Sequence, residues 1–123
     1  MGKYAVRQVK TGVKFNLKAG NGEIIAVSEV YTTKNACLNG IDSIRRNAPI
    51  AALENQTTKG YETAKNPKFQ VYKDKAGEFR FRLTARNGEI IAAASEGYKR
   101  LESCLNGIDS VRRNADSPVV EEE

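Results

Sequence analysis

Residues 15–26 read FNLKAGNGEIIA, and residues 81–92 read FRLTARNGEIIA. A longer pair of matching segments follows them. Residues 28–48 read SEVYTTKNACLNGIDSIRRNA, and residues 95–115 read SEGYKRLESCLNGIDSVRRNA. Self-similarity at a fixed period indicates that one structural unit occurs twice. The sequence therefore predicts an internal duplication.

The period of the repeat assigns nearly the whole chain to the two copies. It is 66 residues in the first pair of segments and 67 in the second, which places a one-residue insertion near Ala93. A chain of 123 residues has the length of one domain. We therefore predict two repeats, residues 1–66 and residues 67–123, that share one core.

Strands are predicted by an alternation of apolar and polar residues. Phe15 and Leu17 face one way, whereas Lys14 and Lys18 face the other, as in a strand with one buried and one solvated face. Asn-Gly pairs at 21–22 and 87–88 predict two-residue hairpin turns, because both residues tolerate positive φ. The expected strands are residues 4–9, 14–19 and 23–27 in the first copy and residues 69–73, 79–86 and 89–94 in the second.

An amphipathic helix is predicted after the three strands of each copy, because apolar residues recur there at steps of three and four. The apolar stripe comprises Cys37, Leu38, Ile41 and Ile44 in the first copy and Leu101, Cys104, Leu105, Ile108 and Val111 in the second. Asn47 and Asn114 are expected to be left-handed caps that end these helices. The expected ion pairs along the helices are Asp42–Arg46 and Asp109–Arg113.

Both copies carry the pattern F-x-L-x-A-x-N-G-E-I-I-A, then S-E-x-Y, then C-L-N-G-I-D-S-[IV]-R-R-N-A. This pattern resembles the YegP-like family of small bacterial and archaeal proteins, over almost the whole chain. The resemblance implies an α+β fold built from βββα(β) units, with a mostly antiparallel sheet and two helices on one face. It also implies that short C-terminal strands, near residues 50–54 and 119–121, are exchanged between the repeats. A monomer with pseudo-two-fold symmetry would then replace a homodimer. The resemblance implies no activity and no functional residues.

The composition offers little to a catalytic site. The chain has no histidine, the commonest general base, and its two cysteines lie on the apolar stripes of the helices. A buried cysteine behaves as a small hydrophobic residue, so we expect free thiols and no disulfide. The carboxylates do not converge in the sequence, and no phosphate-binding glycine motif is present. We therefore expect no enzyme, no metal and no cofactor.

Two glycines stand in the middle of the predicted helices, where glycine costs about 1 kcal/mol relative to alanine. These are Gly40 and Gly107, each preceded by an asparagine, Asn39 and Asn106. Our interpretation is that another group packs closely against each glycine. The alternative is a ligand groove beside the helix, with Asn39 and Asn106 as its polar groups.

The remaining candidate site is the solvated face of the sheet. It carries Lys14, Lys18, Arg80 and Arg82, with Arg7 and Arg86 possible additions. Cations on one face could neutralise the phosphates of a nucleic acid, but sheets that bind single strands also stack bases on exposed aromatic rings. Here the phenylalanines point inward and only Tyr72 points outward. Interspersed charges also keep a sheet face soluble and unaggregated.

The net charge of +5 favours acidic partners, protein or nucleic acid. The sequence has no apolar run long enough to span a membrane and no secretory signal, so we expect a cytoplasmic protein. We interpret the chain as a non-enzymatic binding or interaction module. The alternative is a weak, sequence-nonspecific nucleic-acid binder, whose affinity the acidic residues Glu121 to Glu123 would lower if they lie near the basic face.

Overall fold

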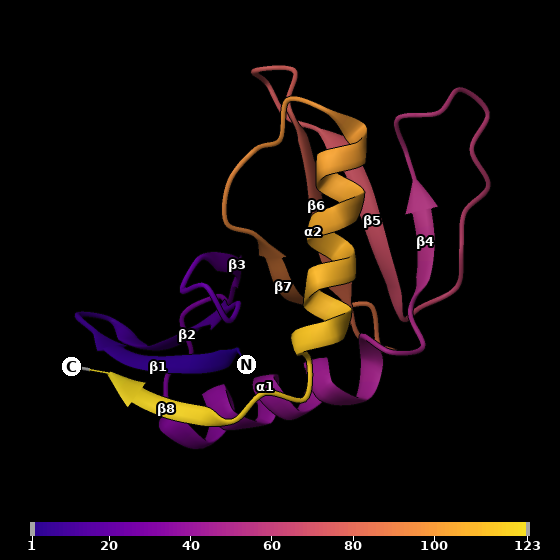
Figure 1. Ribbon diagram of the computed structural model, residues 1–123. Coiled ribbons are helices and arrows are strands. Elements are labelled where there is room, and N and C mark those ends of the chain that lie inside the picture. The colour runs from indigo at the N-terminus through magenta and orange to yellow at the C-terminus, as the bar shows by residue number, and fades with distance from the viewer. Residues whose placement is uncertain (1, 123) are drawn as a thin grey trace.

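The computed structural model describes residues 2–122 (Figure 1). Within them the chain forms one sheet of eight strands and two helices. In chain order the elements are β1 (Lys3–Val9), β2 (Gly12–Lys18), β3 (Ile24–Val27), α1 (Lys34–Asn47), β4 (Ala52–Asn55), β5 (Lys68–Lys73), β6 (Phe79–Thr84), β7 (Ile90–Ala94), α2 (Leu101–Asn114) and β8 (Val119–Glu122). The predicted α+β class is therefore confirmed.

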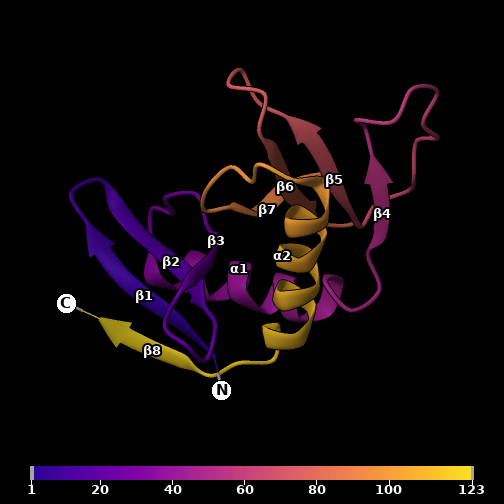
Figure 2. The same cartoon turned by 45° about the horizontal axis from the view of Figure 1, so that its top comes forward.

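The strand order of the sheet is β4-β5-β6-β7-β3-β2-β1-β8. β3 and β7 meet at the centre as antiparallel neighbours, through the pairs Ala26–Ala94 and Val27–Ala93. At the two edges the pairing is parallel: β8 lies beside β1, and β4 lies beside β5. Figures 1 and 2 show the edge strand β8 beside β1, which comes from the opposite end of the chain, and the edge strand β4 beside β5, the first strand of the second half. The last strand of each half thus completes the sheet of the other half, as the family resemblance implies.

The hairpin turns before β3 and β7 differ from the prediction of two-residue turns. The amide of Gly22 donates to the carbonyl of Ala19, and the amide of Ala19 donates to the carbonyl of Glu23, so the loop has three residues. Only Gly22 takes a positive φ, +87°, and the second loop matches it with Gly88 at +86°. Asparagine therefore does not need the left-handed conformation that a two-residue turn would impose.

Both helices pack on one face of the sheet. α1 contacts β2 and β7, and α2 contacts β6, β3 and β2, so each helix touches strands of both halves. Their apolar stripes join the inward side chains of the sheet in a single buried cluster. Its largest fully buried side chains include Tyr4, Phe15, Phe69 and Phe81. The core therefore lies between the two helices and the whole sheet.

The ends of the helices correct two expectations. No residue other than glycine has positive φ in residues 2–122, so Asn47 and Asn114 are not left-handed caps. Each remains helical and donates its side-chain amide to a carbonyl one turn earlier, of Ser43 and of Ser110. The pair Asp109–Arg113 forms at 3.2 Å as expected. The expected pair Asp42–Arg46 does not, because Asp42 instead contacts Arg45 at 3.3 Å.

Three side-chain hydrogen bonds in all join the two halves at the segments that lead into the exchanged strands. Arg45 of α1 donates to the carbonyl of Ser117 at 2.7 Å, just before β8. Arg112 of α2 donates to the carbonyl of Ala51 at 2.8 Å, just before β4. The hydroxyl of Tyr4 donates to the carbonyl of Ala115 at 2.7 Å. The first arginine of each Arg-Arg pair is therefore part of the fold, beyond the favourable interaction with the helix dipole that its position gives.

We predict that neither residues 1–66 nor residues 67–123 folds alone as a monomer. Each fragment lacks the strand that the other contributes, and a unit of this size buries too little apolar surface to be stable by itself. NMR spectra and sedimentation of the separate fragments should show unfolded chains or homodimers. Mixing the two fragments should restore the spectrum of the intact chain. A cooperatively folded monomer from either fragment would contradict this account.

Candidate functional site

The four residues of the predicted basic face fall into two separate pairs. Lys14 and Lys18 lie on β2, and Arg80 and Arg82 lie on β6. β3 and β7 lie between these strands, so the pairs are three strand spacings apart, about 14 Å. The outer face of the sheet is the face turned away from the helices. On it, Val27 and Ala93 lie between the lysine pair and the arginine pair.

Three of these four cations have partners within the protein. Lys18 contacts Glu122 at 3.2 Å, and Arg80 contacts Asp74 at 2.8 Å. Hydrogen bonds from Lys18 and from Arg80 hold the pKa of Glu122 and of Asp74 below their ordinary values. Arg82 donates to Gln70 Oε1 at 2.6 Å and lies 4.7 Å above the ring of Tyr72. The outward aromatic ring that could stack a base is thus already covered by an arginine.

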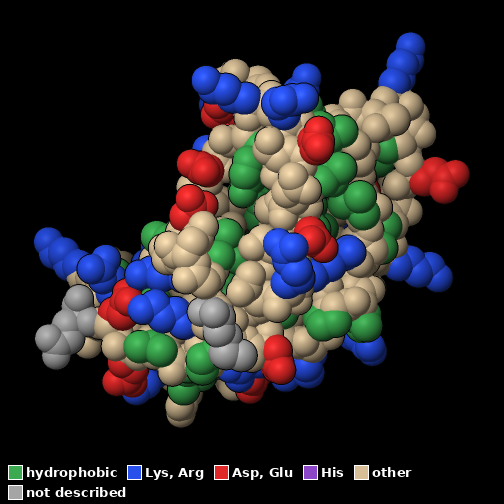
Figure 3. All heavy atoms as spheres, viewed as in Figure 1, with side chains coloured by type: hydrophobic (Ala, Val, Ile, Leu, Met, Phe, Trp, Pro, Cys, Tyr) green, Lys and Arg blue, Asp and Glu red, His purple; other side chains and the backbone are tan. Residues whose placement is uncertain are grey.

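The acidic C-terminal residues lie against basic side chains. Glu122 contacts Lys3 as well as Lys18, and Glu121 contacts Lys34. Glu123, the third acidic residue of the predicted tail, lies outside the described residues. Figure 3 shows Lys and Arg side chains interspersed with Asp and Glu on the visible face. That face offers no broad surface of a single charge.

The two mid-helix glycines are covered by tyrosines. A Cβ added to Gly107 would stand 2.6 Å from Tyr98 Oη and 3.0 Å from its Cζ, and a Cβ on Gly40 would meet the ring of Tyr31 in the same way. Tyr31 in turn stacks on Phe15, and Tyr98 on Phe81, with interplanar angles of 12° and 20°. A tyrosine ring therefore packs closely against each glycine, as the first interpretation of these glycines predicted.

The alternative prediction, a ligand groove beside these helices with Asn39 and Asn106 as its polar groups, does not match the hollows of the structure. Asn39 and Asn106 are exposed, and neither lines any of the hollows described below. The space next to the glycines is filled by the tyrosine rings. Any contact that the asparagines make with a ligand would be on an open helix surface.

Both cysteines are buried and free. Burial raises the pKa of the Cys104 thiol to about 11 and raises that of Cys37 as well. The thiolate is the reactive form, so these thiols are poor nucleophiles at neutral pH. They serve as apolar side chains of the core, as the sequence indicated.

A buried ion pair that the sequence did not indicate lies at the β4–β5 edge. The Glu54 carboxylate, 2% exposed, accepts hydrogen bonds from Lys68 Nζ at 2.8 Å, from Gln56 Nε2 at 2.7 Å and from the Ala64 amide at 2.8 Å. Burial alone would raise the pKa of Glu54, but the hydrogen bonds, that from Lys68 above all, lower it to about 2. This cluster ties the loop of residues 56–67 to the sheet, and its donors leave the carboxylate little capacity to act as a base.

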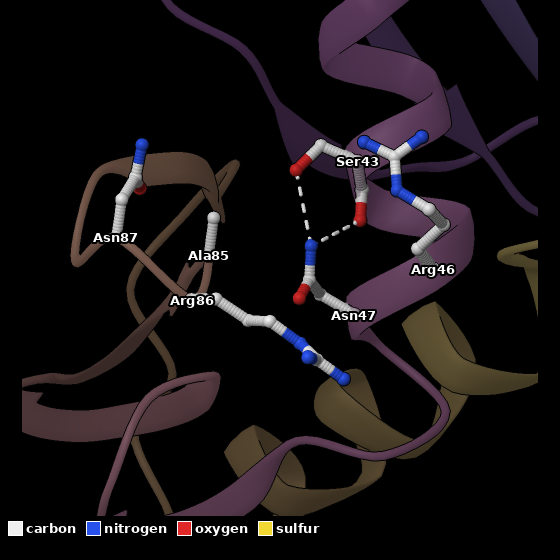
Figure 4. Close-up of a pocket in the computed structure, with 6 residues that line it drawn as sticks. All are labelled: Ser43, Arg46, Asn47, Ala85, Arg86 and Asn87. Carbon is white, nitrogen blue, oxygen red and sulfur yellow. Dashed lines mark hydrogen bonds between the residues drawn. The ribbon is translucent and has the colours of Figure 1, made fainter.

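One hollow of about 460 Å³ lies where the end of α1 faces the hairpin between β6 and β7 (Figure 4). We call it the Arg46–Arg86 hollow. It is lined by Ser43, Arg46, Asn47, Ala85, Arg86 and Asn87. It thus combines residues of the first half with residues of the second, which lie 38 or more positions apart in the chain.

A second hollow, of about 610 Å³, lies between the start of α1 and the end of β8. Val6 and Val13 give it an apolar floor, and the ion pair of Lys34 with Glu121 stands at its rim. In the second half the position of Val13 is taken by Phe79, whose ring lies 5.0 Å from Lys73 Nζ.

No helix in the described part of the chain is both long enough and apolar enough to cross a membrane. Within residues 2–122, no three His, Cys, Asp or Glu side chains come together in a way that could hold a metal ion.

These features describe an α+β protein with one eight-stranded mixed sheet and two helices, and comparison with known proteins gives its family. A model described as "Domain of unknown function (DUF1508)" matches residues 10–54 and again residues 74–122. The chain belongs to this family, as its resemblance to YegP-like proteins predicted.

Relatives extend over the full chain. The UPF0339 protein YegP of Yersinia pestis is 38% identical over 123 residues, which are 99% of this chain and 96% of that protein. The solution NMR structure of yegP from E. coli, described as a protein of unknown function, aligns with a TM-score of 0.79 at 30% identity and covers 98% of this chain and 92% of its own. A UPF0339 protein of Treponema denticola is 58% identical over 55 residues, which are 44% of this chain but 93% of that protein.

We predict that Gly40→Ala and Gly107→Ala each destabilise the protein, by up to about 2 kcal/mol. Overpacking against the tyrosine costs about 1–3 kcal/mol, which exceeds the gain of about 1 kcal/mol in helix propensity. Urea unfolding midpoints measure the effect. Asn39→Ala is the matched control, because Asn39 is exposed on the same helix and its replacement should be neutral or stabilising. Tyr31→Phe should recover part of the loss caused by Gly40→Ala. Stabilisation by both glycine substitutions would refute the packing.

We predict that Glu54→Gln costs about 3 kcal/mol at neutral pH, because it leaves the charge of Lys68 buried without its partner. A lowered pKa in the folded state gives stability that is present above the ordinary pKa and is lost as the pH falls through the folded value. The difference between wild type and Glu54→Gln should therefore shrink as the pH falls from about 4.5 toward about 2. Urea unfolding over this range checks it, with the exposed Glu62→Gln as control. A difference that stays constant with pH would contradict the assignment.

Proposed function

We propose that the protein is a non-catalytic module that binds anionic partners and works as a monomer. The proposal rests on the excess of positive charge at the surface and on the burial or pairing of the groups that could act in catalysis. The net charge is +5, and exposed cations such as Lys10, Arg46 and Arg86 account for it at the surface. A net positive charge attracts anionic partners from a distance and raises their rate of association.

The groups that could do covalent chemistry support a binding role over a catalytic one. Burial keeps the thiols of Cys37 and Cys104 protonated, because it raises the pKa of both. The buried carboxylate of Glu54 is held by three hydrogen bonds, and Asp74 is held by Arg80. Free thiols also suit a reducing compartment such as the cytoplasm, where we place the protein.

We further infer that the chain arose by tandem duplication of one unit. The double match of one family model and a Treponema denticola relative about one unit long support this inference. The strand exchange between the halves supports a monomer, because each half satisfies the sheet edge at which a single unit would pair with another copy. Closed two-fold association is the commonest form of protein assembly, and fusion of its two subunits yields this arrangement.

The second candidate function is weak, sequence-nonspecific binding of nucleic acid through Lys14, Lys18, Arg80 and Arg82. Their positions on the outer face favour it. Contact with phosphates alone gives dissociation constants of about 10⁻⁴–10⁻⁶ M at physiological salt, without sequence preference. Stacking would add about 1–3 kcal/mol per base, but Arg82 already covers the ring of Tyr72.

The main proposal is tested by calorimetric titration with tripolyphosphate, at low and at physiological ionic strength. A binding module for anions should bind it saturably under both conditions and leave it chemically unchanged. No detectable binding at low ionic strength, or hydrolysis of the anion, would refute the proposal.

For the second candidate, we predict that Glu122→Gln strengthens the binding of single-stranded RNA. The substitution releases Lys3 and Lys18 from their ion pairs, and each freed cation can then contact a phosphate. Fluorescence anisotropy should show a several-fold lower dissociation constant at low salt, with an unchanged lack of preference among RNA and DNA sequences.

Glu62→Gln is the control for this experiment, because it changes the net charge equally but lies on an exposed loop away from β2. If both substitutions have the same effect, the gain reflects net charge alone and the basic face is not the contact surface. Submicromolar binding at physiological salt, or a clear sequence preference, would show a specific nucleic-acid site instead.

A further inference from the structure

The second arginine of the Arg-Arg pair differs between the two halves, although the surrounding sequence is repeated. In α2, Arg113 contacts Asp109 at 3.2 Å. In α1, the corresponding carboxylate of Asp42 contacts Arg45, which also donates to the Ser117 carbonyl. The ion pairs of residues 2–122 include neither Arg46 nor Arg86. Two exposed guanidinium groups at one hollow are thus available to a ligand.

The hairpin opposite α1 supplies the other half of the hollow. Arg86 stands at the start of the β6–β7 turn, and Gly20 occupies the equivalent place in the β2–β3 turn. Figure 4 shows Arg86 reaching from this turn across the hollow toward Asn47, while Arg46 rises from α1. Both arginines are exposed, and their guanidinium groups point apart in Figure 4, so a ligand held by both requires the Arg46 side chain to turn toward the hollow.

Asn47 gives the hollow a fixed polar wall. It is 6% exposed and donates its amide to the carbonyl of Ser43 at 2.7 Å and to Ser43 Oγ at 3.1 Å. These bonds hold the side chain so that its Oδ1, an acceptor, is turned toward the hollow (Figure 4). Asn87 accepts a bond from the Glu89 amide through its own Oδ1, which leaves its amide group as a donor.

The equivalent place in the second half is closed. Gly2 is buried there against Asn114 Oδ1, Lys18 O and Ser117 Oγ, with no room for a Cβ. Gly20 brings no cation, and Arg113 is held by Asp109. The two equivalent places therefore share one backbone arrangement. The place at the end of α1 is an accessible cationic hollow, and the place at the end of α2 is closed.

We propose that the Arg46–Arg86 hollow binds a small phosphate monoester that carries a hydroxyl group. Guanidinium groups match phosphate oxygens in bidentate fashion, and they explain the preference for phosphate. The acceptor Oδ1 of Asn47 requires a donor on the ligand, which a hydroxyl group provides. A volume of about 460 Å³ suits a phosphorylated sugar or polyol and not an extended nucleic-acid strand. This inference rests on the proposed function and names its site and ligand class.

The test uses the full-length protein labelled with ¹⁵N and the probe ribose 5-phosphate, at physiological ionic strength. Chemical shift changes should map to Asn47, Arg46 and the β6–β7 turn and should saturate. Inorganic phosphate should bind at least several-fold more weakly, and ribose should not bind. If inorganic phosphate binds equally well, the hydroxyl contact with Asn47 does not exist and the ligand class is wrong.

Arg86→Gly and Arg113→Gln are the paired variants. Arg86→Gly introduces the residue that the equivalent turn already carries, so the fold should tolerate it, and the affinity for ribose 5-phosphate should fall at least tenfold. Arg113→Gln removes an arginine of the same helix position in the closed place and should leave the affinity within twofold of wild type. Equal losses in both variants, or no loss with Arg86→Gly, would overturn the site.

The outcome also separates the site from the proposed function. If tripolyphosphate binds but the shifts of both anions map to Lys14 and Lys18, the hollow is not the site and the anion-binding role survives. If neither tripolyphosphate nor ribose 5-phosphate binds, both proposals fail.

Discussion

The exchange of β4 and β8 between the halves is the constraint on which the rest of the structure depends. Each half forms three antiparallel strands and a helix, and its outermost strand comes from the other half. Arg45 and Arg112 reach from the helices to the carbonyls of Ser117 and Ala51 and so fix the chain where it enters the exchanged strands. The two helices then cover a core that contains side chains of both halves. A local change at the crossing segments should therefore be felt across the whole sheet.

The repeat made most of this fold predictable, because periodicity depends on residue type alone. The alternation around Phe15 gave the strands, and the steps of three and four gave the helices. The details that failed depend on backbone hydrogen bonds. Asn21 was expected to need positive φ, but a three-residue loop places only Gly22 there. Asn47 was expected to take a left-handed conformation, but it is the last helical residue of α1, and its side chain bonds back to Ser43. The crossing contacts of Arg45 were not foreseen, because they join residues 72 positions apart.

The surface was less predictable than the core, because its character depends on which neighbours a side chain finds. The alternation of residues along β2 and β6 predicted that Lys18 and Arg82 share one face of the sheet. It could not show that two central strands separate them or that Glu122 pairs with Lys18. The Arg46–Arg86 hollow brings together a helix end and a turn from different halves, so no local pattern indicates it. The signal available in the sequence was the difference between the copies at Arg86 and Gly20. Where two matching segments of a sequence share a scaffold, the positions at which they differ are the places to look for function.

The central claim is that the two halves form one cooperative unit because each completes the other's sheet. Native-state hydrogen exchange in increasing urea tests it most directly, because it reports the opening free energy of each amide separately. The slowest amides of β2 and β6, and of α1 and α2, should converge on a single free energy equal to that of global unfolding. Two distinct plateaus, one for each half, would show that the halves open independently and would contradict the account.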